Sequence, residues 1–240
     1  MDIRTVTESL ATADGLMPAH LARPARGGPY PAVIVVMEAF GLNPHIKEVA
    51  ERLAREGYVA IAPDLYYRFG SPVVPYDDVP RAVGFMQKFE DAQLMAEMGV
   101  VIQHLKATEG VRADRIGVVG FCVGGRIAFL TACRHPAAIK VAVPFYGGGI
   151  AADTPTAPIH AADRLQCPVL FFFGETDRMI PPDQIRRIDE TLKRLKKTAE
   201  IKVFPGAGHG FFCNDRAAFH QESAQAAWEM TRLSLSKYLK

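Results

Sequence analysis

The chain has 240 residues, of which 49% are hydrophobic, and a formal net charge of +2 from 28 basic and 26 acidic residues. This length suits one α/β domain with a substantial core, so we expect a single domain over residues 1–240. The weak, dispersed charge does not favour nucleic-acid binding. The first residues lack the features of a signal peptide and no apolar run is long enough to span a bilayer, so a cytoplasmic location is expected.

From residue 3 to residue 107 the pattern alternates between strands and helices. Two strands surround Asp14-Gly15, a hairpin turn signal that would give the sheet an antiparallel edge. The proline-containing stretch 63–80 is expected at the surface, where it could lie over an active site. The expected strands are residues 3–11, 16–22, 32–37 and 58–62, and the expected helices cover residues 44–56 and roughly 81–107.

The alternation continues through the second half and predicts a mostly parallel sheet with helices on both faces. Ligands of such sheets bind beyond the carboxyl ends of the strands, where Glu38, Cys122, Asp177 and His209 all fall. After the strand that leads to Cys122, the expected strands are 141–146, 168–173 and 200–204, the expected helices are 123–134 and 183–197, and a loop is expected over 147–166.

The segment around Cys122 carries the strongest signal. The run from Arg115 to Arg126 reads RIGVVGFCVGGR, an apolar strand that enters a glycine-framed cysteine and continues into a helix. This is the pattern of a nucleophile elbow, in which the reactive residue sits on a strained turn. Serine is usual there, and a cysteine indicates acyl transfer through a thioester. The alternative is a buried cysteine of the core, but a packed core has no need of such a turn.

An acid and a base follow Cys122 in the chain order of the α/β-hydrolase fold. His209 is expected to take the thiol proton and return it to the leaving group, while Asp177 orients the imidazole. Glu175 competes with Asp177 for that role, and a plain turn aspartate is the other alternative. His209 lies among glycines, so a surface loop histidine is the alternative there.

Two main-chain groups and one carboxylate complete the predicted site. The N–H groups of Val123 and Ala39 are the expected oxyanion donors. Glu38 stands where an esterase places glycine or histidine, and a carboxylate near a thiol can accept its proton. One hypothesis is that Glu38 holds Cys122 neutral at rest and that an anionic substrate rearranges the pair. The alternative is a glutamate that caps a loop or pairs with an arginine.

Blocks of sequence along nearly the whole chain resemble the dienelactone hydrolases, also called carboxymethylenebutenolidases. The resemblance implies an enzyme with the α/β-hydrolase fold, usually monomeric and cofactor-free. Such an enzyme opens an enol-lactone ring to give maleylacetate. It also implies that Cys122, Asp177 and His209 form a triad and that Glu38 controls the thiol. The blocks are Met37–His45 (MEAFGLNPH), Gly57–Tyr66 (GYVAIAPDLY), Gly120–Gly125 (GFCVGG), Gly174–Asp177 (GETD) and Gly208–Phe211 (GHGF).

The same resemblance implies arginines that hold a substrate carboxylate. Arg81 lies near the position of one of them. The other would follow His209 by four positions, where this chain has Cys213, and Arg216 comes three residues later. Phe40 and Tyr146 are further candidates for substrate contact. An exposed surface position is the alternative for both arginines.

We therefore expect a cysteine hydrolase of a small-molecule ester or lactone, with dienelactone as the leading substrate. A broader carboxylesterase or thioesterase is the near alternative. Two further alternatives are a non-catalytic binding protein on the same fold and a redox-responsive thiol protein that uses Cys122 and Cys213. No cofactor, metal, nucleic acid or membrane is expected, and a monomer is expected with a homodimer as the alternative. Cys133 and Cys167 are expected in the core.

Overall fold

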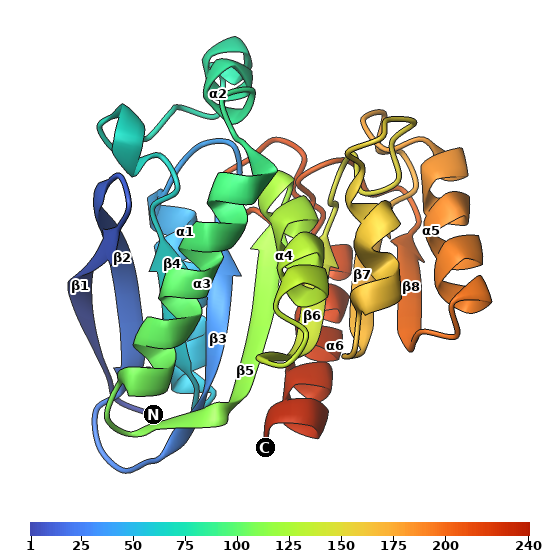
Figure 1. The fold of residues 1–240 in the computed structure, drawn as a ribbon. Helices are drawn as coiled ribbons and strands as arrows, with labels where there is room; N and C mark the ends of the chain where they lie inside the picture. Colours follow the sequence, from blue (N-terminus) through green and yellow to red (C-terminus); the bar gives the residue numbers. More distant parts are fainter.

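The computed structural model describes residues 1–240 and contains one eight-stranded sheet in the order β1-β2-β4-β3-β5-β6-β7-β8 (Figure 1). β2 runs antiparallel to both β1 and β4, and all other neighbours are parallel. The predicted mostly parallel sheet with an antiparallel N-terminal edge is confirmed. The strands are β1 (Ile3–Thr12), β2 (Gly15–Pro24), β3 (Tyr30–Val36), β4 (Val59–Pro63), β5 (Val111–Phe121), β6 (Ile139–Phe145), β7 (Val169–Gly174) and β8 (Ala199–Phe204).

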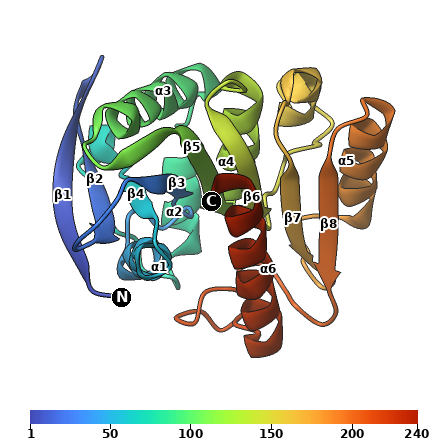
Figure 2. The same cartoon turned by 90° about the horizontal axis from the view of Figure 1, so that it is seen from below.

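Helices cover both faces of the sheet. Seen from below, α1 and α6 lie on one face, and α3, α4 and α5 lie on the other (Figure 2). None of the helices is long and apolar enough to cross a membrane. The helices are α1 (Pro44–Arg55), α2 (Val79–Met86), α3 (Asp91–Ala107), α4 (Val123–Arg134), α5 (Pro182–Arg194) and α6 (Gln221–Leu239), with short 3-10 turns η1 (Tyr67–Phe69) and η2 (Pro158–Arg164).

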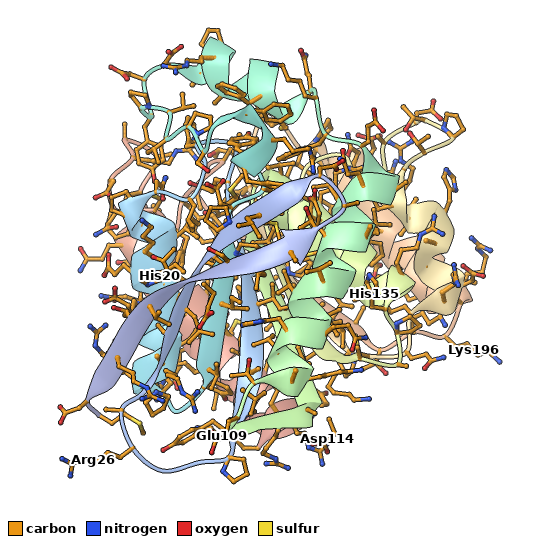
Figure 3. The ribbon with its side chains drawn as sticks, turned by 60° about the vertical axis from the view of Figure 1, so that its left-hand side comes forward. His20, Arg26, Glu109, Asp114, His135 and Lys196 are labelled. Carbon is orange, nitrogen blue, oxygen red and sulfur yellow. The ribbon has the colours of Figure 1, made fainter.

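The centre of the sheet is apolar because helices bury both of its faces. In β3 every residue after Tyr30 is buried, and Val35 pairs in register with Val119 of β5. The view in Figure 3 brings the β1–β2 hairpin forward, with His20 on β2 and His135 just after α4. Nε2–H of His135 donates to the main-chain oxygen of Met95 at 2.9 Å, which ties α4 to α3.

Three elements differ from the sequence expectation. The single helix expected over residues 81–107 is two helices, because residues 87–90 leave the helical path and Glu90 is extended (φ −113°, ψ 125°). The loop expected over residues 147–166 contains η2, and α6 was not among the expected helices. The segment 63–80 does pass over the loop after β3, where the N–H of Val74 donates to the oxygen of Phe40 at 3.0 Å.

Parallel strands bring their carboxyl ends to one edge of the sheet. Loops that leave this edge therefore place distant parts of the chain side by side. The residues that follow β3, β5, β6, β7 and β8 at this edge include Glu38, Cys122, Tyr146, Asp177 and His209.

Candidate active site

Cys122 occupies a strained turn between β5 and α4. Its backbone lies at φ 54° and ψ −121°, a region that residues other than glycine rarely adopt. Close packing around the turn requires glycines on either side. A Cβ on Gly120 would collide with the carbonyl oxygen of Gly124, and a Cβ on Gly124 would collide with those of Val36 and Met37. This geometry holds the thiol at the edge of the sheet.

His209 is held by Asp177. Nδ1–H of His209 donates to Oδ2 of Asp177 at 2.8 Å, and the second carboxylate oxygen accepts from the N–H of Met179 at 2.8 Å. Asp177 is buried and therefore orients the imidazole in a site with little water. Glu175, the competing acid, instead accepts from the main-chain N–H of Gly206 at 2.9 Å.

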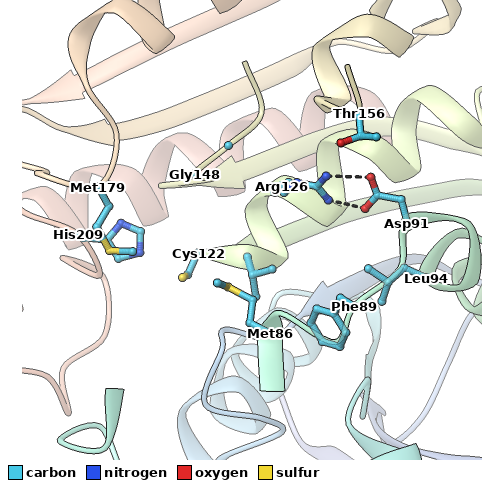
Figure 4. A pocket seen from close by; sticks show the side chains of 12 residues that line it. Met86, Phe89, Asp91, Leu94, Cys122, Arg126, Gly148, Thr156, Met179 and His209 are labelled. Atoms are coloured by element: carbon cyan, nitrogen blue, oxygen red, sulfur yellow. Dashed lines mark hydrogen bonds and ion pairs between the residues drawn. The ribbon is translucent and has the colours of Figure 1, made fainter. Parts of the chain in front are cut away.

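The second ring nitrogen of His209 faces the thiol. Nε2 is buried and has no hydrogen-bond partner, and Figure 4 shows the ring beside Cys122. Burial opposes the positive charge of the imidazole, but its interactions with Asp177 and Cys122 outweigh this and raise the pKa of His209 to about 10. A protonated His209 at neutral pH can stabilise negative charge on the sulfur and later donate its proton.

Two main-chain donors next to Cys122 are free. The N–H groups of Val123 and Ala39 donate no hydrogen bond within the protein. Val123 is the first residue of α4, so the positive end of the helix dipole strengthens the attraction of its N–H for a negatively charged oxygen. The buried hydroxyl of Tyr66 donates to the oxygen of Ala39 at 2.9 Å, which holds the peptide that follows the Ala39 N–H and so restrains this loop.

Glu38 pairs with an arginine and not with the thiol. It is fully buried, and its Oε1 accepts from Nη1 of Arg216 at 3.2 Å. No hydrogen bond joins Glu38 to Cys122, so the structure has the arginine pairing that the sequence left as the alternative. The Arg216 guanidinium also lies over the rings of Phe40 and Tyr76, at 5.2 Å and 5.7 Å. Burial opposes its charge, but the Glu38 carboxylate raises the pKa of Arg216.

A cavity of about 600 Å³ opens beside the thiol. Arg126 crosses its wall in a two-pronged ion pair with Asp91, with Nη1–Oδ1 at 2.6 Å and Nη2–Oδ2 at 2.8 Å (Figure 4). The lining residues are Met86, Phe89, Asp91, Leu94, Cys122, Val123, Arg126, Gly148, Gly149, Thr156, Met179 and His209.

The four expected substrate contacts lie outside this lining. Arg81 is exposed on α2, and Arg216 is engaged by Glu38. Phe40 packs edge-on against Tyr76, with ring centroids 4.7 Å apart. Tyr146 is fully buried and supports the His209 ring edge-on at 5.2 Å.

Sequence reasoning missed Arg126 as a residue of the site, although a signal was present. Arg126 follows Cys122 by four positions at the start of a helix, and residues four apart lie on the same helix face. The remaining cysteines are buried. Burial raises the pKa of both Cys133 and Cys167 to about 12, which fits the core positions expected for them.

Cys213 belongs to a polar cluster near Glu38. Its thiol donates to the hydroxyl of Tyr76 at 3.1 Å, and Nδ2 of Asn43 donates to the same hydroxyl at 2.9 Å. His45, Cys213 and Asp215 bring one ligand atom each within 4.8 Å of one another, which are ligand types that zinc accepts. Burial and the charge of Glu38 raise the pKa of Cys213 to about 11, so a metal there would first have to displace the thiol proton.

Comparison with known proteins identifies the family. A sequence model of the dienelactone hydrolase family matches residues 17–239. A "putative carboxymethylenebutenolidase" of Methylorubrum extorquens is 40% identical over 220 residues, which are 90% of this chain and 75% of that protein. A "probable 2-oxo-3-(5-oxofuran-2-ylidene)propanoate lactonase" of Bradyrhizobium is 33% identical over 225 residues, 92% of this chain and 89% of that protein.

A solved structure extends the likeness to the fold. The crystal structure described as a "putative dienelactone hydrolase" of Klebsiella pneumoniae superposes with a TM-score of 0.91 at 37% identity, and the match covers 99% of this chain and 100% of that one. The match of the family model over almost the whole chain carries the assignment. The chain belongs to the dienelactone hydrolase family, and it is a hydrolase of ester or lactone bonds.

Proposed function

We propose that this protein cleaves a small-molecule ester or lactone through a covalent acyl group on the sulfur of Cys122. The observation that carries the proposal is the line from Asp177 through His209 to the elbow cysteine, with the Asp177–His209 hydrogen bond at 2.8 Å. Such a line places a nucleophile, a proton carrier and an orienting acid in the order that acyl transfer requires.

The first half of the reaction forms a thioester. Nε2 of His209 holds the proton that the thiol gives up, and the sulfur of Cys122 attacks the carbonyl carbon while the N–H groups of Val123 and Ala39 hold the oxygen that becomes negative. As the C–O bond of the ester breaks, Nε2–H of His209 gives its proton to the leaving oxygen. In a lactone the leaving oxygen stays tethered to the acyl group, so the ring opens without releasing an alcohol.

The second half regenerates the thiolate. His209 is neutral after it has protonated the leaving group, so Nε2 can accept a proton from water. The water oxygen forms a bond to the acyl carbon, the bond between that carbon and the Cys122 sulfur breaks, and the carboxylic acid leaves. The sulfur leaves beside the proton on Nε2 of His209, whose raised pKa lets the ring hold that proton.

Two substrate classes are proposed. The names of the relatives support dienelactone, whose ring carries a carboxylate-bearing side chain. The charge of the cavity supports a broader range of carboxylic esters, because Arg126 in its lining is already paired with Asp91. Glu38 and Arg216 are proposed to shape the loop that carries Ala39, since their ion pair is largely buried beside it.

The test is steady-state hydrolysis of cis-dienelactone and of p-nitrophenyl acetate by the wild type and by Cys122→Ala. We expect the substitution to lower kcat/KM for both substrates by at least about a thousandfold. Cys167→Ala is the matched control, because it removes a buried thiol ahead of β7 and away from the cavity. A folded Cys122→Ala protein that keeps its activity would show that another residue carries the reaction.

Peroxide treatment separates the redox alternative. Oxidation of Cys122 should abolish hydrolysis, because a sulfenic acid cannot act as the nucleophile. Unchanged turnover after both Cys122 and Cys213 are oxidised would refute the hydrolase mechanism and favour a redox-responsive protein.

A further inference from the structure

The cavity beside the thiol has two chemically different ends. Cys122 and His209 lie at one end, and Figure 4 shows Arg126, Asp91 and Thr156 grouped away from them. Besides Cys122, five apolar residues contribute to the wall, namely Met86, Phe89, Leu94, Val123 and Met179. A substrate that reacts at Cys122 can therefore extend past apolar side chains to a polar group.

The ion pair at the far end keeps hydrogen-bonding capacity. Of the five N–H donors of the Arg126 guanidinium, two bond Asp91 and three remain. The Asp91 oxygens each keep a further lone pair, and the two side chains are 22% and 35% exposed. Gly149 does not crowd the pair, since even an added Cβ there would lie 4.0 Å from Cδ and Nε of Arg126. The pair thus offers both donors and acceptors to the cavity.

The same pair carries no net charge. Asp91 is the first residue of α3, where the helix dipole stabilises its carboxylate, and it stands against Arg126 in two-pronged contact. A substrate carboxylate would meet the repulsion of Asp91 together with the attraction of Arg126. Because the two opposite charges lie side by side, at similar distances from such a carboxylate, the two contributions largely cancel.

The cavity lining has no unpaired arginine or lysine that could bind a carboxylate in place of Arg126. Arg216 is paired with Glu38, and Arg81 is exposed on α2 outside the cavity. The charge on a protonated His209 faces the sulfur of Cys122. A carboxylate would lose its hydration without gaining an unpaired partner, whereas a neutral hydroxyl or carbonyl loses far less.

We infer that Arg126, Asp91 and Thr156 form a subsite for a neutral hydrogen-bonding group of the substrate, such as a hydroxyl, carbonyl or amide, and that this subsite disfavours a terminal carboxylate. The inference rests on the proposed reaction at Cys122.

The experiment compares three methyl esters of equal chain length: methyl hexanoate, methyl 6-hydroxyhexanoate and monomethyl adipate. We expect the wild type to favour the hydroxy ester over the adipate ester by at least about tenfold in kcat/KM, equivalent to 1.4 kcal/mol. Asp91→Asn leaves the charge of Arg126 unbalanced. It should therefore raise kcat/KM for the adipate ester, relative to kcat/KM for the hydroxy ester, by about tenfold.

Asp183→Asn is the matched control. It removes one negative charge from an exposed ion pair with Arg187 on α5, outside the cavity lining, and should leave the ratio between the two esters as in the wild type. Preference of the wild type for the adipate ester would overturn the inference. The same shift in both aspartate variants would also overturn it, because the effect would then be one of overall charge.

A binding measurement separates this inference from the proposed reaction. Calorimetric titration of Cys122→Ala with each ester measures binding affinity in the absence of hydrolysis. Tighter binding of the hydroxy ester supports the subsite even where no ester is turned over, an outcome that would refute only the reaction. Equal or tighter binding of the adipate ester refutes the subsite even where Cys122-dependent hydrolysis is found.

Discussion

Arg216→Met should destabilise the protein strongly, because it leaves a buried carboxylate without its partner. Glu38 is 0% exposed and the only hydrogen bond to its carboxylate comes from Arg216 at 3.2 Å, while its Oε2 has no partner at all. Removal of one member of a buried ion pair costs about 3–5 kcal/mol. The Arg216 side chain is 16% exposed, so we expect the low end, about 3 kcal/mol. Methionine keeps much of the apolar contact over Phe40 and Tyr76.

The assay is urea unfolding together with calorimetry. For a chain of this size about 1 kcal/mol shifts Tm by roughly 2–4 °C, so Arg216→Met should lower Tm by about 6–12 °C. A second variant isolates the cause. In Arg216→Met/Glu38→Gln no buried charge remains, and we expect the double variant to recover at least about half of the lost stability.

Arg187→Met provides the comparison for a surface pair. Arg187 and Asp183 are 39% and 51% exposed, so this change should cost no more than about 1 kcal/mol. If Arg216→Met costs as little as Arg187→Met, or if Glu38→Gln fails to rescue it, the argument that Arg216 compensates a buried carboxylate is refuted.

The remaining predictions concern the groups around the thiol. Asp177→Asn should lower kcat by about a thousandfold or more in ester hydrolysis with little loss of fold, since the imidazole loses its orienting partner; near-normal kcat would contradict this. The pKa of His209 is raised to about 10 from 6.5, so its contribution to stability is complete below pH 6.5 and is lost as pH rises toward 10. The unfolding free energies of wild type and His209→Gln should therefore converge over that interval, and a constant gap would count against it. Tyr66→Phe should cost about 1 kcal/mol in urea unfolding and lower kcat by loosening the loop at the Ala39–Phe40 peptide, next to the Ala39 N–H; an unchanged kcat would remove that positioning role.

The fold could be predicted from local patterns because strands such as β3, β4, β6 and β7 are short, apolar and followed by a turn or loop signal. The elbow glycines around Cys122 and the glycines before His209 indicated where strands end, and parallel topology then placed those ends at one edge. The break at residues 87–90 could not be predicted in this way. Apolar residues on both sides keep helical spacing across it, and only tertiary packing of Met86 and Phe89 at the cavity explains the change of direction.

Charge partners were the less predictable part of the site. Glu38 and Arg216 are 178 positions apart, and nothing local in the sequence joins them. The choice between Glu175 and Asp177 likewise depends on the path of the loop that carries His209, which sets the Nδ1–Oδ2 distance of 2.8 Å. Arg126 was visible in the elbow motif, but its pairing with Asp91 depends on how α3 packs against α4.

The most direct test of the account is to trap the acyl group. The wild type mixed with p-nitrophenyl acetate and quenched in acid within milliseconds should gain the mass of one acetyl group, and peptide mapping should place it on Cys122. Asp177→Asn should accumulate less of this species in the same interval, because a poorly oriented His209 slows its formation. Hydrolysis without any acyl group on Cys122, or an acyl group on another residue, would contradict the central claim.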